Sequence, residues 1–282
     1  MMSKDLKQPI YLFSIDLEDI RDMVPNGHLL EERVPTNTYK YLEFLKKQQA
    51  YITFFVVGDV ARNYPELIQH IQHEGHEIAC HSDKHLPLDQ LNQDQFKRDL
   101  EANITALVKA GASNIRGYRA PMFSLTEKNA WAYQYLAEAG ITYSSSVLPA
   151  DNFQFGWAKF GEQPQMVAGV LELPMSILNT RYLQYPFGGG AYFRVLPMYL
   201  IQQAFKRKFR QGEPVLGYFH PYDIDTHQKG IRFPYIKSQF YNYLMYYNRK
   251  NMWKRLAKIT KLGGVMMPYQ QYIEQYLAAN EL

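Results

Sequence analysis

Short apolar segments alternate with amphipathic ones along most of the chain. The apolar runs are rich in β-branched and aromatic residues, as expected of strands that are covered on both faces. Between them, apolar residues recur at intervals of three and four, which predicts helices; the interval from Phe96 to Val108 shows this clearly and is followed by Gly111. The predicted strands are 10–15, 51–57, 75–80, 115–118, 141–143, 170–173 and 215–219, and the predicted helices are 35–48, 65–75, 96–108, 126–140, 196–209 and 248–262.

This order of strands and helices predicts an α/β fold built on a parallel sheet, closed into a barrel. In such folds the chemistry lies at the carboxyl ends of the strands. The chain contains no internal repeat and no linker long enough to divide it. We therefore expect a single domain over residues 1–282, with a basic, aromatic-rich helical segment at about 235–282.

Composition narrows the class of protein. With 282 residues and 46% hydrophobic side chains, the chain can bury a large core. Cys80 is the only cysteine, so a disulfide framework is excluded. The first residues lack the apolar region of a signal peptide, and no apolar stretch approaches the length of a bilayer span. The sequence thus predicts a cytoplasmic protein that does not span a membrane.

Polar residues suited to metal binding and acid–base chemistry follow four of the predicted strands. The spacing of His81 and His85 places two imidazoles within reach of one metal ion, although an isolated pair is more often two surface or capping histidines. His73 and His76 are expected to be structural. The residues at the four strand ends are Asp16, Glu18 and Asp19, then His81 and His85, then Arg119, and finally His220.

Eight short segments, taken in chain order, make this pattern specific; they are 14–19, 53–58, 75–85, 117–121, 144–149, 172–174, 188–190 and 219–221. Together they resemble the NodB-type polysaccharide deacetylases, carbohydrate esterase family four. The resemblance extends from about residue 10 to residue 225 and is greatest to the branch associated with exopolysaccharide and exosortase loci. It implies a distorted (β/α) barrel of about seven parallel strands.

The resemblance also implies a site with one divalent metal ion, usually Zn²⁺, with Co²⁺, Ni²⁺ or Mn²⁺ as alternatives. His81 and His85 would be the imidazole ligands of this metal. Asp16 would be the catalytic base, Arg119 would pair with it and keep it ionised, and His220 would be the general acid. Amide hydrolysis needs all of these functions, because water is a weak nucleophile and an amine leaves poorly unless it is protonated.

The acidic metal ligand is either Glu18 or Asp19. Strand alternation places Asp16 and Glu18 on the same face and Asp19 on the other, which favours Glu18. A backbone N–H of Met122 or Phe123 is the candidate oxyanion donor. Gly189 and Tyr222 are candidate substrate-binding residues, with a flexible turn as the alternative for the glycine run 188–190.

Two positions depart from the family pattern. Ser144 stands where close relatives have an aspartate that is thought to hold the catalytic arginine, so Arg119 is expected to be held less firmly. Met122 occupies the position of the usual aromatic residue, which is displaced to Phe123.

The resemblance and the residues together favour a metal-dependent hydrolase that removes an N-acetyl group from an aminosugar, in a glycan or in a lipid-linked precursor. One alternative uses the same machinery on another amide, such as a formyl group on a lipid-linked aminosugar or a small ureide. The other alternative is a catalytically idle barrel that binds glycan, which the serine at position 144 keeps open.

The C-terminal region is the most basic part of the chain, with thirteen lysines and arginines against three acidic residues between Leu196 and Gly264. In the predicted helix 248–262, four lysines lie along one stripe and apolar residues along another. This pattern is typical of a helix that lies on an anionic membrane surface, here the inner leaflet. The alternative is that the apolar stripe packs on the barrel. A nucleic-acid partner is not expected, because the chain contains no recognition module.

Overall fold

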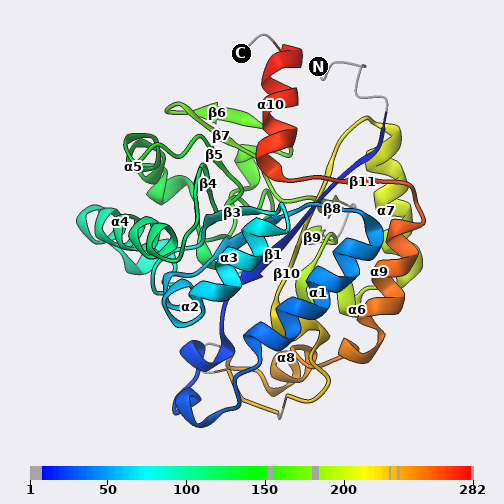
Figure 1. Ribbon diagram of the computed structural model, residues 1–282. Coiled ribbons are helices and arrows are strands. Elements are labelled where there is room, and N and C mark those ends of the chain that lie inside the picture. Colours follow the sequence, from blue (N-terminus) through cyan, green and yellow to red (C-terminus); the bar gives the residue numbers. More distant parts are fainter. Residues whose placement is uncertain (1–7, 152–154, 180–183, 229, 234–235, 281–282) are drawn as a thin grey trace.

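One parallel sheet organises the computed structural model, which describes residues 8–151, 155–179, 184–228, 230–233 and 236–280 (Figure 1). Its strand order is β10-β1-β2-β3-β4-β5-β7-β6, and β11 pairs with the first residues of β1 outside this order. Every pairing is parallel except that of β6 with β7. The strands are β1 (Ile10–Leu17), β2 (Thr53–Val56), β3 (Glu77–Cys80), β4 (Gly117–Tyr118), β5 (Tyr143–Ser144), β6 (Gln165–Val167), β7 (Val170–Glu172), β10 (Val215–Phe219) and β11 (Val265–Met266).

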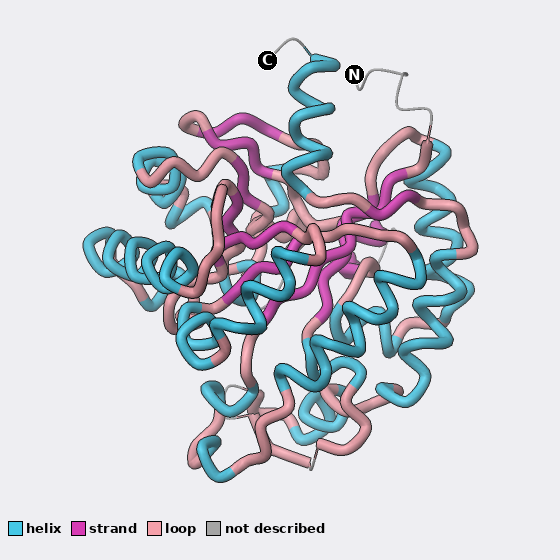
Figure 2. Tube along the Cα trace, viewed as in Figure 1, coloured by secondary structure: helices cyan, strands magenta, loops and turns pink. Residues whose placement is uncertain are grey.

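Helices surround this sheet, as Figure 2 shows with helices in cyan around strands in magenta. Their ends follow local sequence signals: a proline lies in the first turn of α1, and Asn92 and Gln95 cap the start of α4 reciprocally. The helices are α1 (Val34–Gln48), α2 (Gly58–Asn63), α3 (Pro65–His73), α4 (Gln93–Lys109), α5 (Ala132–Glu138), α6 (Gly190–Val195), α7 (Met198–Arg210), α8 (Gln239–Leu244), α9 (Met252–Thr260) and α10 (Tyr269–Asn280).

The barrel is distorted where β10 faces the far edge of the sheet. Within the described residues no backbone ladder joins these two edges; the β8–β9 hairpin (Ile177–Asn179 and Gln184–Pro186) and the glycine run 188–190 lie there instead. A Cβ at Gly189 would lie 1.8 Å from the carbonyl oxygen of Tyr218, so only glycine allows this approach to β10. The glycine run is therefore a packing contact and not merely a flexible turn.

The predicted α/β barrel is confirmed in its main elements. The strand at 215–219 has the predicted bounds, and α1 and α4 lie within one to three residues of theirs. The predicted helix 126–140 is divided into a 3₁₀ turn at Glu127–Asn129 and α5. The predicted strand 141–143 is shifted to β5. The short strands β6, β8 and β9 were not predicted, because three-residue strands leave no periodic signal.

Helix α9 packs on the barrel with its apolar stripe. Met252, Leu256 and Ile259 are buried in the main core, and the ring of Trp253 packs at a tilt against Tyr41 and Phe44. The four lysines of the other stripe, Lys250, Lys254, Lys258 and Lys261, are exposed. The interpretation of this helix as a membrane anchor is therefore wrong, since its apolar face is already occupied. Among the described residues, we find no helix with the length and apolarity that a membrane crossing requires.

The C-terminal helix α10 lies at the amino end of the strands, opposite the end where α8 lies (Figure 1). Tyr269 and Tyr272 of this helix are fully buried. The backbone N–H of Tyr269 donates to Thr53 Oγ1 on β2 at 2.8 Å, and that of Gln270 donates to Glu77 Oε2 on β3 at 3.1 Å. The first turn of α10 is thus fixed against the start of two central strands.

Candidate active site

The acidic residues at the end of β1 and just after it point in different directions, as strand alternation requires. Asp16 and Glu18 face the barrel interior and approach His81, whose Nε2 lies 3.9 Å from Asp16 Oδ2 and 3.7 Å from Glu18 Oε2. Asp19 instead caps the 3₁₀ turn Ile20–Met23, and its Oδ1 accepts the N–H of Arg21 at 2.9 Å. The structure therefore brings Glu18 to the histidines and gives Asp19 a local partner.

Glu18, His81 and His85 form a group of three potential metal ligands whose donor atoms all lie within 4.8 Å of one another. The distance from His85 Nε2 to Glu18 Oε2 is 2.6 Å. Ser82 and His85 both have left-handed backbone conformations, with φ of 68° and 54°, and this tight path after β3 returns His85 to the side of His81. Two imidazoles and one carboxylate are a donor set that suits Zn²⁺ and leaves a coordination position for a further ligand.

Contacts behind this group orient its members for metal binding. His81 Nδ1 lies 2.8 Å from the backbone carbonyl of Arg119, which favours the tautomer with the free lone pair on Nε2. Tyr222 donates its hydroxyl to Glu18 Oε1 at 2.7 Å. Burial alone would raise the pKa of Glu18, but the nearby imidazoles of His85 and His220 outweigh it and hold the pKa well below its usual value. The carboxylate is therefore ionised, as a metal ligand must be.

Arg119 is fully buried and bound on all three of its nitrogens. Its Nη1 donates to Asp16 Oδ1 at 2.5 Å and to Ser14 Oγ at 2.7 Å, and the guanidinium carbon lies 3.9 Å from the centre of the Phe55 ring. The expectation that Arg119 is held loosely is wrong. Ser144 donates its hydroxyl to Ser146 at 2.7 Å, and other residues hold the arginine.

His220 is held by Asp223, three residues further along the chain. Asp223 Oδ2 accepts the backbone N–H of His220 and lies 2.9 Å from His220 Nδ1, so that Nε2 is directed toward Glu18 Oε1, 3.7 Å away. The ring of Tyr222 stacks on the imidazole with centroids 4.6 Å apart. Burial would lower the pKa of His220, but the carboxylates of Glu18 and Asp223 outweigh it and raise the pKa to about 9.

Behind Asp223 lies a second buried charge. The Nε of Arg194, on α6, is 3.1 Å from Asp223 Oδ1, and both side chains are inaccessible to solvent. Burial would raise the pKa of Asp223, but Arg194 and His220 outweigh it and lower the pKa. Asp223 is thus an ionised carboxylate between two cationic side chains, which fixes the orientation of the imidazole.

The two candidate oxyanion donors differ in availability. Met122 and Phe123 both have left-handed backbone conformations, with φ of 57° and 53°. The N–H of Phe123 donates to the carbonyl of Ala120 at 3.1 Å, so Phe123 is not available as an oxyanion donor. Met122 lines the cleft beside Glu18 and His85, so its N–H is the remaining candidate oxyanion donor.

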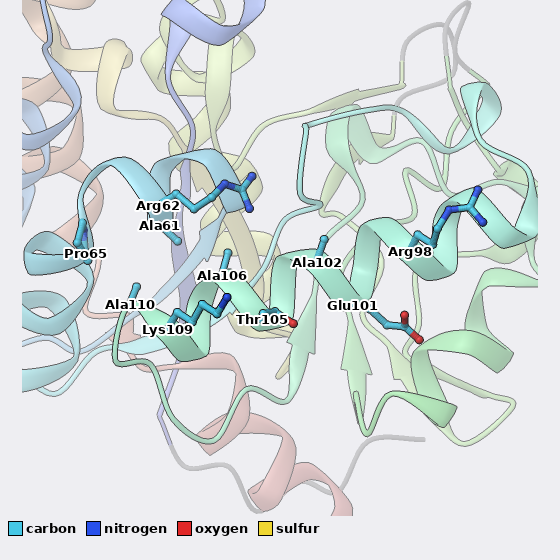
Figure 3. A pocket seen from close by; sticks show the side chains of 10 residues that line it. All are labelled: Ala61, Arg62, Pro65, Arg98, Glu101, Ala102, Thr105, Ala106, Lys109 and Ala110. Atoms are coloured by element: carbon cyan, nitrogen blue, oxygen red, sulfur yellow. The ribbon is translucent and has the colours of Figure 1, made fainter.

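The cleft at the candidate site has a volume of about 450 Å³. Besides Glu18, His85 and Met122, its wall carries four more carboxylates and one lysine: Asp19, Asp22, Asp59, Asp89 and Lys84. A larger groove of about 560 Å³ lies between α2, α3 and α4, on the outside of the barrel (Figure 3). That groove contains none of the candidate ligands, so the smaller cleft is the candidate active site.

The two predicted substrate-binding residues both make structural contacts, and their role toward a substrate stays a prediction. Gly189 packs on the backbone of Tyr218, and Tyr222 holds Glu18 and His220. Sequence reasoning missed Asp223, Arg194 and Tyr269. Asp223 could have been found from its spacing of three residues after His220, whereas no local pattern points to the other two.

Comparison with protein families divides the chain into two segments. Residues 19–144 match the family model described as polysaccharide deacetylase. Residues 145–263 match a model described only as a domain of unknown function, DUF3473. The boundary falls at the end of β5, and the sheet continues across it through β7 and β10.

Curated relatives are similar over short segments. A chitooligosaccharide deacetylase of Sinorhizobium fredii is 33% identical over 88 residues, 31% of this chain and 41% of that protein. The peptidoglycan-N-acetylmuramic acid deacetylase PdaA of Bacillus subtilis is 38% identical over 65 residues, 23% of this chain and 25% of that protein. The chain thus spans less than half the length of these relatives.

Solved structures share the fold over the whole chain. A protein of Mycobacterium smegmatis, assigned only provisionally as a polysaccharide deacetylase, superposes with a TM-score of 0.59 at 17% identity, over 100% of this chain and 96% of that one. The peptidoglycan deacetylase PdaC of Bacillus subtilis has a TM-score of 0.50 at 14% identity, over 98% of this chain and 94% of that one. Similarities at this level of identity establish the fold.

Proposed function

We propose that this protein has the function of the NodB-type polysaccharide deacetylases, the family that its sequence matches support. The protein is a metal-dependent hydrolase that removes an N-acetyl group from an aminosugar in a glycan or in a lipid-linked glycan precursor. The observation that carries the proposal is the convergence of Glu18, His81 and His85 on one point, with Asp16 and His220 beside it.

Glu18, His81 and His85 would hold one divalent ion, with zinc favoured by the donor set and Co²⁺, Ni²⁺ or Mn²⁺ as alternatives. Such an ion, when bound, supplies a Lewis acid that makes water a better nucleophile and polarises the acetyl carbonyl. The oriented Nε2 of His81 and the ionised Glu18 fit this role.

The protein's own residues would move the protons. Asp16, oriented by Arg119, takes a proton from the water that attacks the acetyl carbon. The N–H of Met122, a residue that lines the cleft, would donate to the oxygen that becomes negative. His220, which Asp223 orients, then gives a proton to the sugar nitrogen as the carbon–nitrogen bond breaks. The products are acetate and a free amine.

The idle-barrel alternative is weakened by the interior of the site. A barrel that only binds glycan needs no buried arginine paired with a carboxylate beside a three-ligand group. The serine that kept this alternative open does not loosen Arg119, because Ser14, Ser145 and Tyr269 supply its other hydrogen bonds.

A release assay tests the proposal. The metal-loaded protein is incubated with N-acetylated oligosaccharides, nucleotide sugars and lipid-linked sugars, and acetate and formate are measured in parallel. We expect acetate from at least one N-acetylhexosamine substrate and none from His81→Ala. Formate from an N-formyl sugar without acetate would favour the deformylase alternative. Glycan binding that survives chelation, with neither acid released, would favour the idle barrel.

Contact with an anionic membrane surface, if the substrate is lipid-linked, would have to use a different element from α9. The exposed aromatic side chains Phe240, Tyr241, Tyr243 and Tyr247 lie in and just after α8, beside the exposed basic residue Lys237. We expect co-sedimentation with anionic liposomes that Phe240→Ser with Tyr243→Ser abolishes, while Lys46→Gln, an exposed lysine on α1, has no effect. Unchanged binding by the double variant would contradict this contact.

A further inference from the structure

The side chain of Tyr269 enters the barrel from the end opposite the candidate active site and contacts Arg119. Arg119 Nη2 donates to the hydroxyl oxygen of Tyr269 at 2.9 Å, and the guanidinium carbon lies 5.5 Å from the centre of the tyrosine ring. Tyr269 is fully buried. It lies beyond both family-matched segments, which end at residues 144 and 263.

The tyrosine hydroxyl is the best-placed acceptor for one side of the guanidinium. Nη1 is bound by Ser14 and Asp16, and Nε donates to the backbone carbonyl of Ser145 at 3.1 Å. The other acceptor for Nη2 is Ser145 Oγ, at a longer distance of 3.3 Å. Loss of the tyrosine hydroxyl would leave Nη2 of this buried, charged group with one weak partner, which allows the guanidinium to rotate away from Asp16.

Tyr269 is itself firmly placed. Its backbone N–H is bound to β2 and the next N–H to β3, as described above. Its ring stacks on Tyr143 with centroids 5.9 Å apart and meets Phe55 edge-on at 5.4 Å. Phe55 also carries the guanidinium of Arg119 on its face, so the tyrosine and the arginine share one wall of the barrel.

We propose that Tyr269 is a positioning residue for the reaction: the C-terminal helix α10 reaches through the barrel to hold Arg119, and through it Asp16. The effect of Tyr269 on catalysis rests on the proposed function. The contact between Tyr269 and Arg119 is independent of it. The inference assigns a role to a segment outside both family matches. The site is then complete only when α10 is docked at the amino end of the strands.

Helix α10 offers a matched control for the test. Tyr272 is equally buried on the same helix, and its hydroxyl has no hydrogen-bond partner among the described residues. Tyr269→Phe and Tyr272→Phe therefore each remove one buried hydroxyl, but only the first removes a contact with Arg119. Both variants are compared with the wild type in kcat and KM for acetate release from a chitooligosaccharide. The exchange rate of the Arg119 Nε–H is measured by NMR in all three.

We expect Tyr269→Phe to lower kcat by about ten- to a hundredfold, with KM changed less than about threefold. The exchange of the Arg119 side-chain N–H should become about tenfold faster. Tyr272→Phe should leave both quantities at the wild-type value. Arg119→Lys lacks the Nη2 atom that donates to Tyr269. In this background, Tyr269→Phe should cause no further loss of kcat.

Exchange at Arg119 that is the same in Tyr269→Phe and wild type would overturn the inference, as would equal losses of kcat in the two tyrosine variants. A wild type that releases no acetate would count against the proposed function, while the exchange measurement still decides the contact. If Tyr269→Phe does not fold, 3-fluorotyrosine at position 269 alone provides a weaker acceptor of nearly the same shape. It should accelerate exchange at Arg119 by a smaller factor, and no acceleration would contradict the inference.

Discussion

The two sides of the candidate site are built in different ways. The metal side consists of Glu18, His81 and His85, which directly contact one another. The two histidines lie in the segment that matches the deacetylase model, and Glu18 directly precedes that segment. The acid side consists of His220 and the residues that hold it, Asp223 and Arg194, which lie in the half that matches only a domain of unknown function. Its key ion pair is completely buried.

Because of this difference, changes on the metal side should affect metal binding, whereas changes on the acid side should affect the reaction rate. A metal ligand acts through a short, direct bond, so that its removal should abolish metal binding. The acid side acts through the orientation and charge of one imidazole, so that changes there should reduce the rate while leaving the metal in place. The same distinction applies to Arg119, which is oriented by Ser14, Ser145 and Tyr269.

The largest effect with retained metal is expected for His220→Asn. Without the imidazole, no group is placed to protonate the leaving amine, and kcat should fall by about 10²- to 10⁴-fold. Metal content, measured by elemental analysis, should equal that of the wild type. Loss of the metal together with activity would show that His220 is a metal ligand. The metal side and the acid side would then not have separate roles.

A smaller effect is expected for Asp223→Asn. The neutral amide still fills the space but no longer stabilises the required orientation, so kcat should fall by about ten- to a hundredfold. Since Arg194 would lose its buried partner, the free energy of unfolding should also fall, by up to about 3–5 kcal/mol. Urea denaturation and acetate release measured on the same preparation check both parts. Asp151→Asn, an exposed aspartate that does not line the cleft, serves as the control and should change neither.

The smallest effect concerns the free energy of unfolding and a histidine away from the site, His76. It shows whether this histidine makes the folded protein less stable at acidic pH. His76 is buried, and its Nδ1 accepts the N–H of Ile52 at 3.2 Å, which requires a neutral ring. Burial lowers the pKa of His76 to about 4, against about 6.5 in an unfolded chain. Between these values the unfolded chain binds the extra proton, so the folded state loses stability as the pH falls from about 6.5 toward 4.

From pH 7 to pH 5, the loss attributable to His76 is at most about 2 kcal/mol. His76→Asn keeps an acceptor for Ile52 and cannot be protonated in this range, so its free energy of unfolding should fall less than that of the wild type. Urea denaturation at the two pH values provides the comparison. Equal losses in the two proteins would mean that other groups account for the acid sensitivity.

The sequence predicted those parts of the site that depend on local pattern. Strands and helices with clear periodicity, such as β10 and α4, follow from the spacing of apolar residues. The meeting of Glu18 with His81 and His85 follows from strand alternation and from the rule that parallel strands end at the same edge.

The remaining contacts depend on distances in space that leave no mark in the local sequence. Arg194 reaches Asp223 across 29 positions, and Tyr269 reaches Arg119 across 150. The serine at position 144 led to the prediction that Arg119 is held loosely. The hydroxyl that compensates for it belongs to Tyr269, on a helix at the other end of the barrel, and the local sequence shows no sign of this contact. The exposed charge pattern of α9 likewise concealed that its apolar face is covered.

The central claim is that Glu18, rather than Asp19, completes a metal site with His81 and His85, and metal content tests it directly. Elemental analysis of the wild type, Glu18→Gln and Asp19→Asn, each dialysed against the same zinc-containing buffer, measures the ions bound per chain. We predict about one ion in the wild type and in Asp19→Asn, and little or none in Glu18→Gln. One ion in Glu18→Gln and none in Asp19→Asn would contradict the account.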